Sequence, residues 1–354
     1  MITLCASILL TGLRYITSKG YTPELVSDSG IEYPISLSTG LDRNGRDVFP
    51  DKKFLQYINE EVFRTGKHSG NKFDLDDDGY LSKEECETVR ILSIAGRMDI
   101  TSAAGVEAFP KLREFYCNGT GIRELDLSHN PRLQILACSN SPVETLDICS
   151  CTILRELKAA GCALSHIDLA SNGALELLTC LEQKRTAGGY YEDGKYMVDL
   201  NDLDLQIDLS KISDVKIDGA AGDGINSGYD SSAGIVYCSD EIQTVSYTYY
   251  FNFSGAANAS MDSQMNVTLS IVNGYRESFQ TDGGSKVLAE YYNGVRDCAP
   301  VEPVREGYSF TGWYRDKDRT EPYHFNQILD RNIELYAGWE KKSYRVIYRA
   351  EGTS

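Results

Sequence analysis

The sequence predicts a multidomain, mainly β chain in which a small helical cap precedes a stacked repeat and a separate small β module. Leucines recur at a constant spacing in the middle of the chain, and a fixed period predicts coils that stack on one another. Two later segments align with each other at a longer spacing. An acidic loop with apolar residues at helical spacing on both sides precedes the first repeat.

The composition favours a folded chain whose surface attracts cations. The chain has 354 residues, of which 42% are hydrophobic, and 52 acidic residues against 35 basic ones give a formal charge of −17. That charge repels nucleic acid and anionic lipid, so no nucleic-acid partner is expected. Ten cysteines occur without the dense spacing of a small disulfide scaffold, so their number does not fix the redox compartment. No segment is a transmembrane candidate.

Residues 1–48 are interpreted as an N-terminal segment. Its start, MITLCASILLTGLRYITSKG, contains an apolar stretch that is too short to span a bilayer. No basic residue precedes that stretch, and no clear small-residue cleavage site follows it. The sequence leaves two interpretations open, a truncated signal region or a buried apolar strand.

Residues 49–90 are predicted to form a helical cap with an EF-hand-like calcium loop. The stretch FDLDDDGYLSKEE, which begins at Phe73, satisfies the spacing D-x-[DN]-x-[DN]-G-x5-E. Ca²⁺ takes six to eight oxygen ligands, and glycine at the sixth position permits the sharp turn. The predicted Ca²⁺ ligands are the carboxylates of Asp74, Asp76 and Asp78, the backbone carbonyl of Tyr80, Ser82 directly or through water, and the bidentate carboxylate of Glu85.

The same loop has a simpler interpretation, in which Ser82 and Glu85 form a helix capping box and the aspartates are merely solvated. Calcium is favoured because three close aspartates repel one another without a cation. No second copy of the motif occurs in the chain. The loop is therefore interpreted as a structural clip that orders the cap at the apolar end of the stack.

Residues 91–272 are predicted to form the stacked repeat and the strands that close it. The equally spaced leucines that set the period are Leu112, Leu133, Leu154 and Leu175. A looser copy begins at Ile91, one such interval before Leu112. Each coil has a narrow apolar edge that it cannot bury alone, so the coils are expected to share one continuous core.

The segments LREFYCNGTGIRELDLSHNPR and LQILACSNSPVETLDICSCTI resemble the leucine-rich repeats of bacterial internalin-like surface proteins. A column of Cys117, Cys138 and Cys180 resembles the cysteine ladder of one branch of that family. The resemblance implies a leucine-rich-repeat solenoid. Two departures are present, since Ala159 breaks the ladder and Cys151 occupies a turn position that is asparagine in other coils.

The thiols are interpreted as small apolar side chains packed in the core. A metal site from Cys149, Cys151 and Cys162 is an alternative, but these residues lack a paired CxxC arrangement. After Cys180, LEQKRTAGGYYEDGKYM is predicted to be a surface loop. One or two further coils are expected in VDLNDLDLQIDLSKISDVKIDG, and strands in IVYCSDEIQTVSYTYYFNF and MNVTLSIV.

Residues 273–340 are predicted to form a small β module, and residues 341–354 the start of another. GYRESFQTDGG and SYRVIYRAEG align so that Tyr275 matches Tyr344 and Gly283 matches Gly352. Between them, PVEPVREGYSFTGWYRDKDRTEPYHFNQILDRNIELYAGWE resembles the B-repeat of internalins and other bacterial surface proteins. The resemblance implies a β-grasp-like fold. Its aromatic residues are interpreted as the core, because a module of about 70 residues depends on a few large side chains for burial.

No catalytic chemistry is assigned, and the chain is not expected to be an enzyme. The sequence contains no G-x-S-x-G, H-E-x-x-H or P-loop motif. Aspartates recur at the same offset in successive coils, at Asp126, Asp147 and Asp168. They are interpreted as a ladder of turn hydrogen bonds rather than acid/base pairs.

The expected function is recognition. The candidate partner-binding residues are the outward positions of the LxxLxC half-repeat, namely Glu114, Tyr116, Asn118, Ile135, Ser139, Glu156 and Lys158. This mixed aromatic, apolar and acidic face suits a protein or glycan ligand on a host or bacterial surface. Whether that half-repeat forms the concave face is left open.

We expect a monomeric, adhesin-like protein that is secreted or displayed on the bacterial cell surface, with Ca²⁺ in the cap and B-repeats as a stalk. The alternative is that these are accessory modules of a larger secreted enzyme whose catalytic domain lies outside this chain.

Overall fold

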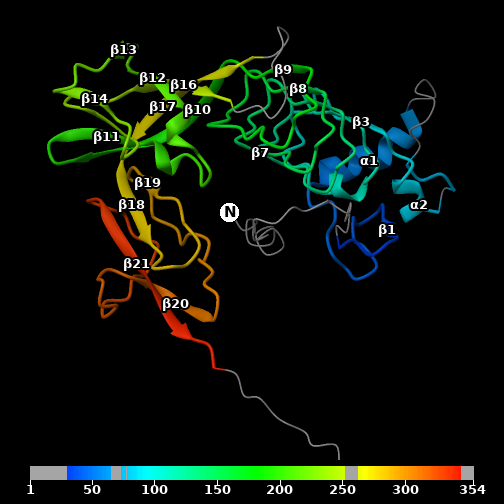
Figure 1. Cartoon of the computed structure of the whole chain (residues 1–354). Coiled ribbons are helices and arrows are strands. Elements are labelled where there is room, and N and C mark those ends of the chain that lie inside the picture. Colours follow the sequence, from blue (N-terminus) through cyan, green and yellow to red (C-terminus); the bar gives the residue numbers. More distant parts are fainter. Residues whose placement is uncertain (1–29, 65–72, 77, 252–261, 344–354) are drawn as a thin grey trace, which may run out of the picture.

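The computed structural model describes residues 30–64, 73–76, 78–251 and 262–343. The prediction of a mainly β chain is confirmed, since the described residues contain two α-helices, α1 (Lys52–Arg64) and α2 (Lys83–Cys86), and many strands. The helical cap lies at one end of the stacked coils, a large sheet lies at the other end, and the small module lies beside that sheet (Figure 1). The predicted signal region at residues 1–29 and most of the predicted further repeat, residues 344–354, lie outside the described residues.

The cap contains α1, α2 and one two-stranded sheet. Strands β1 (Ile35–Ser36) and β2 (Tyr80–Leu81) pair antiparallel. Asp51 precedes α1, and its Oδ1 accepts hydrogen bonds from the Lys53 and Phe54 backbone N–H groups at 2.8 and 3.2 Å. Its Oδ2 accepts the Thr101 N–H at 2.7 Å, so one carboxylate both caps the helix and joins the cap to the first coil.

The cap core includes residues that precede position 49. The side chains of Ile35, Leu37, Phe49, Phe54 and Leu81 are all buried. The Phe49 and Phe54 rings meet edge to face, with centroids 5.6 Å apart. Residues 30–48 therefore pack into the cap, although the sequence interpretation assigned them to the segment before it.

Five parallel strands run through the coils. They are β3 (Ile91–Ser93), β4 (Glu114–Tyr116), β6 (Ile135–Ala137), β8 (Glu156–Lys158) and β9 (Leu177–Thr179). They form one sheet in that order. A second, two-stranded parallel sheet joins β5 (Glu124–Asp126) and β7 (Thr145–Asp147) on another side of the coils. We call residues 91–180 the coil stack.

The period holds in the later coils, but the first coil is longer than predicted. Glu114 pairs with Ile135 and Ile135 with Glu156, the same interval that separates the leucines. A constant period would place Ile91 opposite Leu112, but Ile91 pairs with Glu114 instead. The predicted register of the first copy is therefore wrong by two positions. The 3-10 helix η1 (Val106–Ala108) lies in this longer interval.

The core of the coil stack repeats with the coils. Cys117, Cys138, Ala159 and Cys180 are fully buried in one column. Burial raises the pKa of the Cys117 and Cys180 thiols far above the ordinary value. These thiols therefore stay protonated and pack as small apolar groups, as the sequence interpretation expects.

The aspartate column forms the predicted ladder of turn hydrogen bonds. The Oδ1 atoms of Asp126, Asp147 and Asp168 each accept the backbone N–H two residues further on, at 2.9 to 3.0 Å. All three side chains are exposed. Their recurrence is explained by turn formation in each coil.

An eight-stranded sheet closes the far end of the coil stack. Its order is β13-β12-β16-β17-β10-β11-β15-β14. The strands are β10 (Gln183–Glu192), β11 (Lys195–Asp199), β12 (Ile212–Ile217), β13 (Ala220–Ala221), β14 (Ser227–Asp230), β15 (Ile235–Cys238), β16 (Thr244–Tyr250) and β17 (Gln264–Asn273). The buried Tyr247 hydroxyl donates to the Ser165 carbonyl at 2.8 Å. The predicted closing strands are therefore confirmed.

Two predictions for this region are wrong. The segment after Cys180 is not a loop, because β10 pairs in parallel with β17 and the hairpin to β11 turns at Asp193 and Gly194, both with positive φ. Asp-Gly is a hairpin signal that was interpreted as part of a loop. The expected further coils are replaced by β11, β12 and the 3-10 helices η2 (Leu200–Asp202) and η3 (Leu209–Lys211).

A separate four-stranded sheet forms the C-terminal module, which we call the repeat module. Its strands are β18 (Tyr275–Gln280), β19 (Glu290–Tyr292), β20 (Tyr308–Tyr314) and β21 (Ile333–Lys341), in the order β19-β18-β21-β20. β18 and β21 are parallel. The buried core is small and consists of Phe279, Trp313, Tyr323, Leu335 and Ala337. Partly buried aromatic side chains, including Phe310 and Trp339, pack against it, as predicted.

Charged groups join the repeat module to the eight-stranded sheet. The Arg276 guanidinium contacts the carboxylates of Asp199 and Asp202 at 3.0 and 2.9 Å. The Tyr291 hydroxyl donates to Asp202 at 2.6 Å. A Cβ at Gly188 would lie 2.0 Å from the Tyr291 ring, so only glycine permits this contact.

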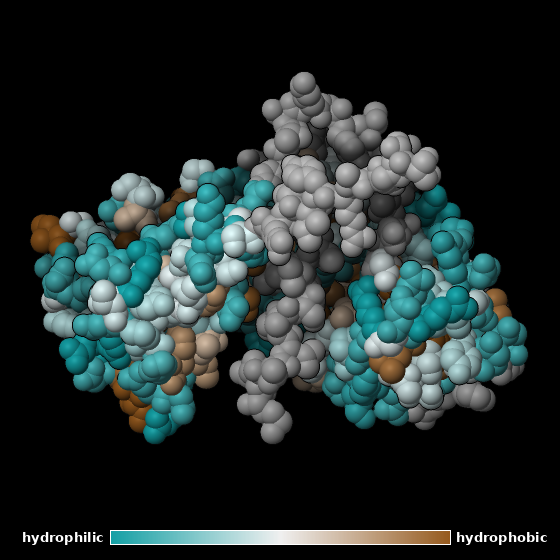
Figure 2. All heavy atoms as spheres, turned by 90° about the horizontal axis from the view of Figure 1, so that it is seen from below, coloured by the Kyte–Doolittle hydropathy of each residue, from teal (hydrophilic) through white to brown (hydrophobic). Residues whose placement is uncertain are grey.

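The surface facing the viewer in Figure 2 is mostly hydrophilic, and the apolar residues on it lie in small separate groups. Scattered apolar residues are normal on a folded surface.

Candidate metal centre and candidate binding face

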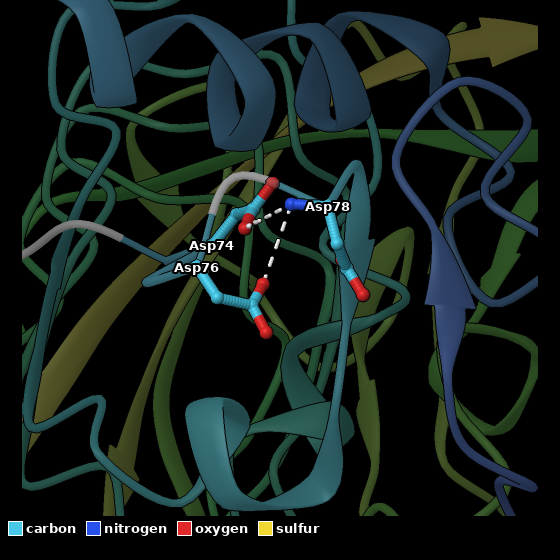
Figure 3. A group of neighbouring side chains, drawn as sticks. All are labelled: Asp74, Asp76 and Asp78. Carbon is cyan, nitrogen blue, oxygen red and sulfur yellow. Dashed lines mark hydrogen bonds between the residues drawn. The ribbon is translucent and has the colours of Figure 1, made fainter.

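The structure gathers three of the predicted metal ligands. Carboxylate oxygens of Asp74, Asp76 and Asp78 all lie within 4.8 Å of one another. The three side chains extend from one turn of the loop, and the Asp78 backbone nitrogen donates to Asp74 and Asp76 (Figure 3). Two oxygens bound to one Ca²⁺ lie at most about 5 Å apart, because Ca–O distances are about 2.3–2.6 Å. The carboxylate spacing therefore fits a shared cation.

The loop conformation depends on Gly79. Its φ is +83°, and its N–H donates to Asp74 Oδ2 at 3.0 Å. A Cβ at this position would meet nothing within 4 Å, so glycine is required by the backbone angle rather than by crowding. This is the turn that the sixth position of the motif predicts.

Glu85 faces a different set of partners from the one predicted. Its Oε1 accepts the Leu75 N–H at 2.6 Å, and its Oε2 accepts the Ser82 N–H and hydroxyl, both at 2.8 Å. Ser82 in turn accepts the Glu85 N–H, which completes the capping box of α2. Burial alone would raise the pKa of Glu85, but these hydrogen bonds hold it below the ordinary value. The capping-box interpretation of Ser82 and Glu85 is therefore what the structure shows.

Electrostatics favour a cation at the three aspartates. Loss of hydration and the carboxylates of Asp78, Glu85 and Asp74 raise the pKa of Asp76. A raised pKa means that the anionic form is disfavoured by its like-charged neighbours. A bound divalent cation would relieve this repulsion.

A strand from the N-terminal side braces the loop. Leu81 and Ile35, directly opposite each other in the β1–β2 pair, are both fully buried. The Leu37 N–H also donates to the Gly79 carbonyl at 3.1 Å. The single acidic loop thus takes its strand partner from residues 35–36 rather than from a second acidic loop. The sequence interpretation missed this role.

Five of the seven candidate binding residues lie on strands of the five-stranded sheet. Glu114, Ile135 and Glu156 pair directly across three strands, and Tyr116 and Lys158 flank Ala137 in the next row. All five candidates are half-buried, whereas the intervening core positions are fully buried. Leu177 and Thr179 continue the two rows on β9. These two were missed because the repeat pattern breaks after Leu175.

Polar contacts order this face. The Tyr116 hydroxyl donates to Glu114 Oε2 at 2.8 Å, and Lys158 Nζ lies 3.0 Å from Glu156 Oε2. Burial, the Glu114 hydrogen bond and the charge of Glu156 raise the pKa of Tyr116 to about 12, so its hydroxyl stays a donor at neutral pH. The face therefore presents a neutral phenol between acidic groups and one lysine.

Asn118 and Ser139 have a structural role. The Asn118 side-chain oxygen accepts the Ser139 backbone N–H at 2.9 Å, which links one coil to the next. These two candidates lie beyond the C-terminal ends of β4 and β6. They are half-buried, like the five candidates on the strands.

A buried polar column within the coils was also missed from the sequence. Ser141, Cys162 and Gln183 each donate to a carbonyl oxygen of the preceding coil, at 2.8, 3.2 and 2.8 Å. The Cys162 thiol thus donates a hydrogen bond to a backbone carbonyl, and the Cys151 thiol donates to the Leu127 carbonyl at 3.6 Å. Burial raises the pKa of Cys151 to about 12, which disfavours the thiolate that a metal site would need.

None of the helices in the described ranges combines the length and the hydropathy needed to cross a membrane.

Comparisons with known proteins found similarity to one family model and to curated relatives. Residues 275–338 match the family model described as the Listeria-Bacteroides repeat domain. Two proteins of Evansella cellulosilytica, provisionally named as a membrane protein and a Gly-rich membrane protein, match over 87 residues with 41% and 39% identity. The match covers 23% of this chain but only 13% and 10% of those relatives, so this chain corresponds to a small part of their length.

Two solved structures are similar at low identity. One is described as the functional domain of InlJ from Listeria monocytogenes, which includes a cysteine ladder. It has a TM-score of 0.34 and 20% identity, over 49% of this chain and 37% of that one. The other contains CBM51-2 in complex with GlcNAc and INT domains from Clostridium perfringens ZmpB. It has a TM-score of 0.26 and 12% identity, over 64% of this chain and 37% of that one. The segment from residue 275 to 338, which contains most of the repeat module, is similar to the Listeria-Bacteroides repeat domain.

Proposed function

We propose that this chain is a non-catalytic, adhesin-like binding protein of the bacterial cell surface or of the secreted fraction. The similarity of residues 275–338 to a bacterial repeat domain and the membrane-protein names of the matched relatives support a cell-envelope setting. The proposed ligand is a protein or a glycan, bound by the outward face of the five-stranded sheet.

One observation carries this proposal. Inward positions of the five strands repeat, whereas the outward positions differ from coil to coil, as Glu114, Ile135, Glu156 and Leu177 do along one row. A scaffold that fixes the backbone and varies the exposed side chains suits recognition of one particular surface. The half-buried Tyr116 supplies an aromatic side chain of the kind that often dominates binding energy.

The test measures binding of the labelled full chain to host epithelial surfaces and to bacterial cell wall. Replacing Tyr116→Ala together with Lys158→Glu should lower the affinity at least tenfold if these side chains contact the ligand. The matched control, Thr145→Ala, changes an exposed position on the other sheet and should leave binding unchanged. Saturable binding that both variants retain would contradict the proposed face, and no binding by the folded chain would favour accessory modules of a larger enzyme.

We also propose that Ca²⁺ binds the cap through Asp74, Asp76 and Asp78, with the Tyr80 carbonyl, Ser82 and Glu85 as the remaining ligands. The close carboxylates support this part of the proposal. Glu85 would have to exchange its present hydrogen bonds to take part.

Terbium luminescence sensitised by Tyr80 in the full chain tests the calcium site. We expect a saturable signal that Ca²⁺ displaces more readily than Mg²⁺, because Mg²⁺ requires tighter octahedral geometry. Asp76→Asn should weaken binding. An exposed aspartate away from the loop, Asp330→Asn, is the control. A signal that is equal in both variants would argue against the loop.

A further inference from the structure

Glu277 is a buried carboxylic acid in the core of the repeat module. It lies on β18, where it pairs with Glu290 of β19 and Ile333 of β21, and its side chain is fully buried. Two residues further along the same strand, Phe279 faces the aromatic core. Neither carboxyl oxygen of Glu277 has a hydrogen-bond partner among the described residues. An ionised carboxylate in such a place is strongly disfavoured.

The donors around Glu277 are engaged by other acids. The Tyr323 hydroxyl donates to Asp297, which is itself buried, and the Tyr292 hydroxyl donates to Glu290. The Asp297 side chain also accepts the Gln327 N–H. The nearby cation, Arg315, lies over the Tyr323 ring at 4.6 Å and reaches Gln327 Oε1 at 3.3 Å. The Tyr323 and Tyr292 hydroxyls thus donate to Asp297 and Glu290. Tyr323 lies near enough to Glu277 to lower its pKa, but it does not donate to Glu277.

The aligned segment near the end of the sequence carries no acid at the corresponding position. In the alignment that matches Tyr275 and Arg276 with Tyr344 and Arg345, Glu277 corresponds to Val346. An apolar residue is the ordinary occupant of a buried strand position. The glutamate is therefore not shared by the two aligned segments.

We propose that the Glu277 carboxyl group is a proton-binding site that couples the stability of the repeat module to pH. The folded module holds the proton because the core accepts a neutral carboxyl group and disfavours its anion. Loss of that proton places a negative charge beside Asp297 and Glu290 and weakens the module.

The direction of the effect follows from the pKa. Burial, together with the charges of Asp297 and Glu290, raises the pKa of Glu277 from 4.5 to about 8, while Tyr323 and Arg315 act in the opposite direction. Between these two values the folded module holds a proton that the unfolded chain releases. Stability is therefore full below the unfolded pKa and falls as the pH rises through the folded pKa.

The chain provides a specific probe for this test. Its two tryptophans, Trp313 and Trp339, both lie in the repeat module. Tryptophan emission during urea unfolding of the full chain thus reports the module alone. A His324→Asn background removes the one histidine of residues 273–340, since an unperturbed histidine titrates near pH 6.5 in the same range.

In that background, the unfolding constant of the module should rise by up to about tenfold per pH unit between about pH 5 and pH 8, the slope for one released proton. Glu277→Gln should abolish this rise. Glu302→Gln, which changes an exposed acid of the same module, should retain it. Should Glu277→Gln fail to fold, Glu277→Val, which copies the residue at position 346, replaces it. A pH-independent constant in the background protein, or a slope that survives at Glu277→Gln or Glu277→Val, would overturn the proposal.

Discussion

The coil stack and the repeat module are both built from repeated sequence, but the buried asparagines of the first donate hydrogen bonds, whereas the buried Glu277 of the second makes none within the described residues. In the coil stack, the side-chain amides of Asn130 and Asn172 each donate to two carbonyls of the preceding coil, at 3.0 to 3.1 Å. In the repeat module, Glu277 is buried with no partner for either oxygen in the described structure. The first arrangement stabilises the neighbouring coil, and the second makes one module sensitive to its environment.

The two regions also differ in how the apolar core is distributed. Coils share one continuous core, so each leucine is supported by the coils on both sides. The repeat module closes around one small hydrophobic cluster that includes Phe279 and Trp313, whose ring centroids lie 4.9 Å apart. Loss of one aromatic side chain should therefore affect the module far more completely than loss of one leucine affects the coil stack.

The largest expected effect is that of Trp313→Ala. Truncating a buried tryptophan costs about 3–5 kcal/mol, which approaches the stability that a core of this size supplies. Trp339 emission should then show an unfolded module while the far-ultraviolet circular dichroism of the coils persists. Leu136→Ala in the coil stack is the matched change, and it should leave Trp339 emission unchanged. Equal changes in both signals for both variants would show that the two regions unfold as one unit.

The next largest effect is expected at the contact between the repeat module and the eight-stranded sheet. Arg276→Met leaves the carboxylates of Asp199 and Asp202 without their cation, and hydrogen bonds to charged groups contribute about 1.5–3 kcal/mol. We expect the module to detach from the sheet while both remain folded. Limited proteolysis should then cut near Asn273, and Arg331→Met, at an exposed ion pair, should not cause this. An unchanged digestion pattern would show that the remaining contacts, among them those of Tyr291 and Asn332, suffice to hold the module against the sheet.

Within the coil stack, Asn130, Cys151 and Asn172 occupy equivalent buried positions in successive coils. Two substitutions in this asparagine column should change stability in opposite directions. Asn172→Ala removes the donor to the Ile148 and Cys151 carbonyls and should cost about 1–3 kcal/mol. Cys151→Asn supplies a stronger donor where the thiol now lies 3.6 Å from the Leu127 and Asn130 carbonyls. That change should stabilise the coils by about 0.5–1.5 kcal/mol. Urea unfolding monitored by circular dichroism measures the change in the free energy of unfolding for both variants. Destabilisation by Cys151→Asn would show that the larger asparagine side chain does not fit where the thiol packs.

The smallest expected effect is that of Arg155→Ala. Its guanidinium pairs with Glu176 at 2.7 Å, but both side chains are more than half exposed. Exposed pairs contribute little to stability, and less at high salt. The same urea experiment at low and high ionic strength should show a small, salt-dependent loss. A loss of stability as large as that of Asn172→Ala would mean that ion pairs on the surface contribute as much to coil packing as the asparagine column does.

Much of the fold could be predicted because its signals are local or periodic. The spacing of Leu112, Leu133 and Leu154 located the coils, and the motif from Asp74 to Glu85 located the acidic loop. The prediction for Gln183 to Glu192 was wrong because glycines that permit close contacts were interpreted as loop glycines. Of the predicted metal ligands, three aspartates are brought together, whereas Glu85 is directed to the helix cap.

By itself the sequence determined which residues recur. The recurring residues located the coils, the turn hydrogen bonds of the aspartates and the repeat module, because periodicity and turn chemistry act over short stretches of chain. The tertiary structure decided the partner of each segment. It paired Ile35–Ser36 with the acidic loop, placed β10 beside β17, and set Arg276 against Asp199 and Asp202. It also buried Glu277 without a donor. Such contacts join residues far apart in the chain, and their energies depend on burial and on neighbouring charges that only the folded arrangement supplies.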